Sequence, residues 1–285
     1  MTRTPSDPSF LRSRYKLVLL AYSVRSFVAL LLGWPLAQSF SPGNVAALPG
    51  RGRELFAPGA SLLLPLLAQR SRELLPWWQF GWTLGLLAVL VGAVVTTVIF
   101  SALAVPTEVR ASVWLCRSVR RVPANVALTL SGWIAFGGIL FLARTLYALV
   151  PTLIYPFFGE KGADVALGLL FLAVAFAGLI TLTIVDLARA ENSQEDSGLR
   201  QSLAVALECL GDRFCGCITG PLSYCILAIA LPIVVEANLL PAVNQTTGRL
   251  LLTLAMHQLA VLGICALHLR WWHFAIRLVA LRQPV

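Results

Sequence analysis

The sequence has few charged residues. Only 12% of its 285 residues are Asp, Glu, Lys or Arg, against about a quarter in an average soluble domain. Hydrophobic residues make up 58% of the chain, and they gather in long stretches that carry no charge. A water-soluble fold of this length does not contain such runs, so the composition predicts an integral membrane protein.

Acidic residues are scarcer than basic ones, 13 against 22, which gives a formal net charge of +9. In a soluble protein this excess would suggest a nucleic-acid partner, because clustered Lys and Arg neutralise phosphates. Here almost every basic residue flanks an apolar run, where membrane orientation and anionic headgroups explain it. We therefore expect the lipid bilayer as a partner and no nucleic acid.

The usual patterns of a metal or haem site are missing. The three histidines, His257, His268 and His273, all lie near the end of the chain. A haem between two histidines needs ligands from facing helices, and zinc usually uses tight pairs such as C-x₂-C. The six cysteines define no disulfide framework in a chain this hydrophobic. We expect no metal and no other cofactor.

What the sequence does contain is six apolar segments that approach or exceed the roughly 20 residues of a membrane-spanning helix. They cover residues 26–42, 78–105, 126–150, 165–185, 214–235 and 250–269. The first can be extended back to residue 16 and is interrupted by Pro35. The predicted fold class is all-α: a polytopic membrane protein with six transmembrane helices, forming one integral membrane domain over residues 1–285.

Basic residues predict the orientation, because Lys and Arg in short loops stay on the cytoplasmic side. With both termini inside, 15 basic residues fall on that side, six fall outside, and Arg144 falls within a span. A basic cytoplasmic interface precedes the third span and consists of Arg110, Arg117, Arg120 and Arg121. Trp271 and Trp272 are expected in an interfacial aromatic belt.

The six spans also group into a predicted three-fold internal repeat. Its units cover about residues 8–105, 108–187 and 198–281. Each unit begins with an amphipathic helix expected to lie in the cytoplasmic interface, followed by a transmembrane hairpin. Chance similarity among amphipathic hairpins is the alternative explanation. Pairs of small residues such as Gly216 and Gly220 indicate close helix packing in the bundle.

Polar residues within the spans are candidate functional residues, because an unpaired charge in hydrocarbon costs about 2.5–3.5 kcal/mol or more. A predicted polar cluster in the outer half of the bundle comprises Arg144, Tyr147, Glu236, Asn238 and His257. The alternative is that its charged members reach to the interface and His257 bonds a neighbouring helix. Asp186 is expected among the cytoplasmic headgroups near Arg189.

No standard catalytic motif is present, neither a P-loop nor H-E-x-x-H. Six spans with an inside N-terminus invite comparison with rhomboid-type intramembrane serine proteases, whose nucleophile motif is Gly-x-Ser-Gly. The nearest match here is Thr129-Leu130-Ser131-Gly132, which has threonine in place of the first glycine. We therefore expect no enzyme and no catalytic residues.

The repeated arrangement of helix and hairpin resembles that of bacterial six-span proteins related to the membrane domain of some glycerophosphodiester phosphodiesterases. The resemblance implies a bacterial inner-membrane protein acting as a non-enzymatic scaffold or accessory subunit of a membrane complex, associated with lipids and with protein partners. The alternative is a transporter, because six spans with cytoplasmic helices also resemble the permease subunits of ABC exporters, which work with a separate ATPase.

Overall fold

The structure is a computed structural model that describes residues 9–39, 71–104, 111–195, 198–239 and 247–281. It divides the chain into two compact units. One comprises Met1–Tyr22 together with Ala93–Val285, and the other comprises Ser23–Gly92. The smaller unit contains the later part of helix α1 and the first part of α4. All the polar contacts discussed below lie within the larger unit.

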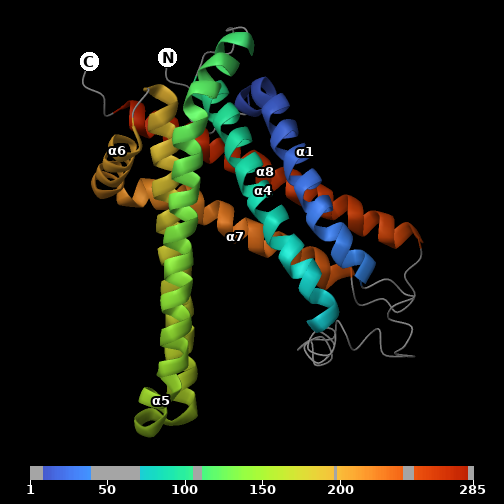
Figure 1. The fold of residues 1–285 in the computed structure, drawn as a ribbon, viewed down its shortest axis with the longest axis vertical. Coiled ribbons are helices and arrows are strands. Elements are labelled where there is room, and N and C mark those ends of the chain that lie inside the picture. Colours follow the sequence, from blue (N-terminus) through green and yellow to red (C-terminus); the bar gives the residue numbers. More distant parts are fainter. Residues whose placement is uncertain (1–8, 40–70, 105–110, 196–197, 240–246, 282–285) are drawn as a thin grey trace. The chain divides into compact units, whose positions relative to one another are not determined.

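Every regular element in the described part of the chain is a helix (Figure 1). The helices are α1 (Ser9–Ser39), α4 (Ser71–Ala104), α5 (Ala111–Gln194), α6 (Leu199–Asp212), α7 (Phe214–Leu239) and α8 (Thr247–Ala280). The all-α prediction is confirmed for these residues. Their apolar content explains this result, because a backbone in lipid must satisfy its own hydrogen bonds.

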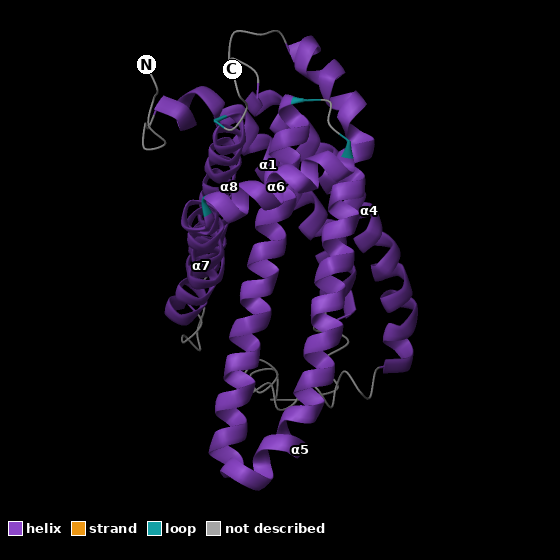
Figure 2. Cartoon of the chain, turned by 90° about the vertical axis from the view of Figure 1, so that its left-hand side faces the viewer, coloured by secondary structure: helices purple, strands orange, loops and turns teal. Residues whose placement is uncertain are grey.

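The helix α5 is a hairpin of two long legs, residues 111–158 and 160–194. Gly159 separates them with φ 65° and ψ −168°, a conformation open almost only to glycine. The legs run side by side to this turn (Figure 2). Their close approach uses further glycines, since a Cβ at Gly132 would lie 2.8 Å from Val185 Cγ2 on the opposite leg.

Four helical segments are long and apolar enough to cross a membrane. They are Thr83–Ala104, Leu115–Val150, Thr152–Gln194 and Ala255–Ala280. A fifth arises if α6 and the start of α7 form one bent span. This count, made on the described residues, supports a multi-pass membrane protein. Part of the first predicted span lies outside the described side chains, and the six-span count stays a prediction.

The amphipathic helix of the third predicted repeat unit exists as α6. It meets α7 at an angle of 99°, and its buried residues are Ser202, Ala206, Cys209 and Leu210. The second unit differs, because its amphipathic stretch continues without a break into the first leg of α5. The first unit likewise has one continuous helix, α1. A separate helix before the hairpin is thus found in one unit.

The hydrophobic core of the larger unit lies where the two ends of α5 meet α6, the start of α7, the last turns of α8 and the parts of α1 and α4 that belong to this unit. Leu128, Leu187, Ala206, Cys217 and Leu269 are almost inaccessible there. The opposite end of α5, toward the turn, is exposed: between residues 130 and 162 no described side chain is buried. The core therefore covers one end of the hairpin, and the rest of the hairpin is exposed on the surface of the protein.

Candidate functional site

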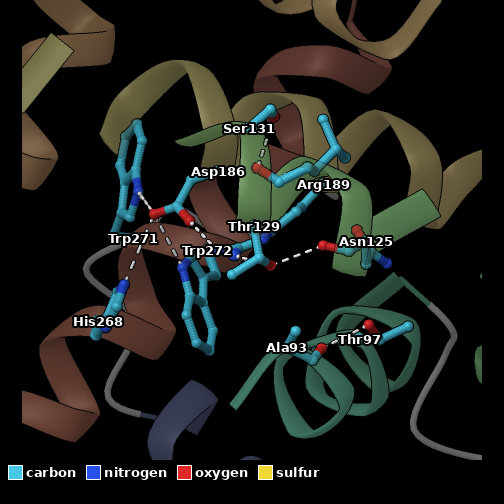
Figure 3. A network of polar contacts seen from close by, with 11 residues as sticks. Ala93, Thr97, Asn125, Thr129, Ser131, Asp186, Arg189, His268, Trp271 and Trp272 are labelled. Carbon is cyan, nitrogen blue, oxygen red and sulfur yellow. Dashed lines mark hydrogen bonds and ion pairs between the residues drawn. The ribbon is translucent and has the colours of Figure 1, made fainter. Parts of the chain in front are cut away.

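A buried network of polar side chains lies within this core, and Asp186 is its centre (Figure 3). Asp186 comes from the second leg of α5 and is fully buried. Its Oδ1 accepts a hydrogen bond from Arg189 Nη1 at 3.1 Å, three residues further along the same helix. The two side chains therefore form a buried ion pair within one turn of helix.

Two adjacent tryptophans of α8 complete the coordination of this carboxylate. Trp271 Nε1 donates to Asp186 Oδ2 at 3.0 Å, and Trp272 Nε1 donates to the same oxygen at 3.1 Å. Both tryptophans are buried. The expected place of these residues in an interfacial belt is therefore wrong: their indoles lie in the protein core, because the N–H groups serve a buried acceptor.

His268 and its aromatic neighbours extend the network toward α4 and α7. His268 Nε2 lies 3.6 Å from Asp186 Oδ2. The imidazole ring lies between Tyr224 of α7 and Trp272, with centroid distances of 4.4 and 4.2 Å. The ring of Trp272 in turn packs against that of Phe100 of α4, with their centroids 5.0 Å apart. The partners of this carboxylate come from α5 and α8, and their aromatic contacts extend to α4 and α7.

The other end of the network joins the two legs of α5. Arg189 Nη2 donates to Thr129 Oγ1 at 2.7 Å, and the Thr129 hydroxyl donates to the Asn125 carbonyl at 2.7 Å. Nearer the leg ends, Arg121 Nη1 donates to the Ser193 carbonyl. These contacts replace the hydrogen bonds to water that the buried groups lose. They hold the two legs together at the base of the hairpin, which is the end away from the Gly159 turn.

Some buried polar atoms beside the network have no hydrogen-bond partner among the described residues. They include Asn125 Oδ1, Arg189 Nε, Glu191 Oε2 and Asn192 Nδ2. Next to them, a mostly apolar cavity of about 310 Å³ opens between the two legs, with Arg189 and Thr129 at its polar end. The arrangement can hold a charge pair in the protein interior and admit an apolar group beside it.

The cluster predicted from the sequence is a different set of residues. Arg144 and Tyr147 are exposed on the first leg of α5, and His257 is exposed on α8. No hydrogen bond or ion pair joins these three side chains in the described part of the chain. Glu236 and Asn238 belong to α7, but their side chains lie outside the described residues. The joint cluster stays a prediction.

Asp186 was expected among the cytoplasmic headgroups near Arg189. The pairing with Arg189 is confirmed, and protein side chains enclose the carboxylate instead of leaving it exposed. Its depth in the membrane stays a prediction. The missed signal was the coincidence of an acid at the end of one apolar segment with the pair Trp271-Trp272 at the end of another. Two indole donors beside each other suit a single buried acceptor.

Three of the four arginines of the predicted cytoplasmic interface lie on described residues near the base of α5. Arg117 and Arg120 are exposed, Arg121 is buried, and Arg110 lies outside the described residues. All six cysteines are free thiols. Within the described helices, no group of three His, Cys, Asp or Glu side chains could hold a metal ion.

Comparison with known proteins identifies no relative of this chain. No protein-family model matches the sequence, and no curated protein or solved structure matches it.

Proposed function

We propose that this protein is a non-enzymatic scaffold or accessory subunit of a membrane complex, with the α5 hairpin as its docking element. The observation that carries the proposal is the exposure of that hairpin. In an apolar stretch of 18 residues, only 11% of the first leg and 6% of the second leg are buried. The corresponding stretches of α4 and α8 are each 39% buried. Apolar surface of this extent must be covered by lipid or by protein.

Aromatic residues near the turn favour protein over lipid for part of this surface. The exposed stretch of the first leg, residues 130–158, rises about 43 Å as a helix. A bilayer with its headgroups is about 40–45 Å thick, so the turn reaches the edge of the bilayer, where a second protein can contact it. The end nearest the turn exposes Tyr155, Phe157 and Phe158 by 57, 81 and 74%. Aromatic side chains of this kind are typical anchors in protein interfaces.

Site-specific photo-crosslinking in the native membrane tests the docking role. A photoreactive phenylalanine at Phe157, near the turn, and at Phe141, which is 73% exposed on the first leg, is expected to form discrete adducts with a second protein. Leu207, which is 54% exposed on α6, is the control and should give no such protein adduct. Adducts with lipid alone at both α5 positions would contradict the proposal.

A proton-coupled transporter is the second candidate, supported by the buried Asp186, Arg189 and His268. Ionisable groups within spans commonly serve as proton relays. Proteoliposomes that contain a pH-sensitive dye and carry an imposed membrane potential separate the two functions. A scaffold gives the proton flux of protein-free vesicles. A transporter gives a protein-dependent flux that is lost in the double variant Asp186→Leu/Arg189→Met, which removes both charges of the pair.

A further inference from the structure

A basic pocket lies at the base of the α5 hairpin and shares only Arg121 with the polar network described above. Its volume is about 360 Å³. Four residues of the first leg line it together with Gln194, at the end of the second leg; they are Cys116, Arg117, Arg120 and Arg121. Spacings of three and four residues bring the three guanidinium groups to one face of the helix.

The pocket has a fixed wall and two available cations. Arg121 and Gln194 form the wall, because Arg121 donates to the Ser193 carbonyl and Gln194 donates to the Ile276 carbonyl of α8. Arg117 and Arg120 are exposed and make no hydrogen bond or ion pair with any described residue. Two guanidinium groups without an ion-pair partner among the described residues, beside a fixed wall, suit an anion with several oxygens, such as a phosphate.

The surrounding surface indicates that this phosphate belongs to a lipid. Val119, which lies between Arg117 and Arg120 in the sequence, is 70% exposed, and Leu115, one turn earlier, is 44% exposed. The same helix continues directly into the apolar leg that is predicted to cross the membrane. A ligand at this place therefore meets positive charge and apolar surface together, as the headgroup and chains of an anionic phospholipid require.

We propose that Arg117 and Arg120, supported by Arg121 and Gln194, bind the phosphate group of an anionic phospholipid at the base of α5. The proposal is independent of the scaffold function, because a transporter would present the same pocket. Arg121 is left unchanged in the test, since its hydrogen bond to Ser193 holds the two legs together.

Lipid binding to the delipidated full chain, followed by native mass spectrometry, tests this assignment. Phosphatidylglycerol is expected to bind more tightly than phosphatidylcholine. The variant Arg117→Gln/Arg120→Gln should weaken phosphatidylglycerol binding about 30-fold, from the interaction typical of two basic residues near an anionic surface. Its melting temperature should match that of the wild type, because both side chains are exposed.

The matched control is Arg200→Gln/Arg270→Gln, which also removes two exposed arginines from the predicted cytoplasmic side and should leave lipid binding unchanged. Equal loss in both double variants would overturn the assignment, because net charge alone would then explain binding. Displacement of the lipid by millimolar inorganic phosphate would overturn it in favour of a soluble anion. Displacement by polyglutamate, without any preference between the two lipids, would overturn it in favour of an acidic protein.

Discussion

The variant Asp186→Ala is expected to lose about 3–5 kcal/mol of stability, the typical cost of removing one partner from a buried ion pair. Arg189 would keep its positive charge in the core with Thr129 as its remaining partner among the described residues, and both tryptophan N–H groups would lose their acceptor. This loss corresponds to a melting temperature roughly 10 °C lower. Thermal unfolding of the detergent-solubilised protein, followed by size-exclusion chromatography, measures it.

Asp164→Ala is the matched control, because Asp164 is an exposed acid on the same leg of α5. It should melt within about 2 °C of the wild type, as exposed substitutions usually do. The double variant Asp186→Leu/Arg189→Met should recover much of the lost stability, since no buried charge remains unpaired. Equal melting temperatures for Asp186→Ala and Asp164→Ala would show that the network does not stabilise the fold.

The second large effect is expected at Gly220, where α7 passes Trp271 of α8. A Cβ at this position would overlap the indole ring and lie 2.8 Å from its Cζ3 atom. Trp271 cannot move away cheaply, because it is 3% exposed and donates to Asp186. Gly220→Ala should therefore cost about 1–3 kcal/mol, the usual price of overpacking a core, and the same thermal measurement detects it.

Gly216 offers a control four residues earlier on the same helix. A Cβ there would meet no atom within 4 Å. Gly216→Ala should be neutral or slightly stabilising, because alanine has the higher helix propensity by about 0.5–1 kcal/mol. A loss of stability in Gly220→Ala together with a gain in Gly216→Ala would confirm that, of these two glycines, Gly220 serves close packing. A stability loss of the same size at both would point to a general cost of alanine in α7.

The helices could be predicted from the sequence because hydrophobicity and length suffice to identify a membrane helix. Segments 78–105, 126–150 and 165–185 each lie largely within a candidate span of the structure. The separate helix at 199–212 was also predictable, since its apolar residues recur at helical spacing and a bend follows it. Local pattern was sufficient for these features because each depends on residues close in the chain.

The continuous legs of α5 could not be predicted in the same way. The stretch around Arg117 has the basic and apolar stripes of an interfacial helix, so a break before the third span was expected there. Pro123 sits within the helix without ending it. Whether an amphipathic stretch bends away or continues straight depends on what packs against it, and here Arg121 bonds to Ser193 of the other leg.

The sequence by itself determined that the protein is helical and multi-pass, because the scarcity of charge leaves no other solvent for most of its residues than lipid or protein. Only the tertiary structure decided which of the few polar residues meet. The buried carboxylate of Asp186 contacts Arg189, His268 and the two tryptophans, which lie up to 86 residues from it in the chain. Hydropathy ranks each residue alone, whereas the free energy of a buried charge depends on its partners.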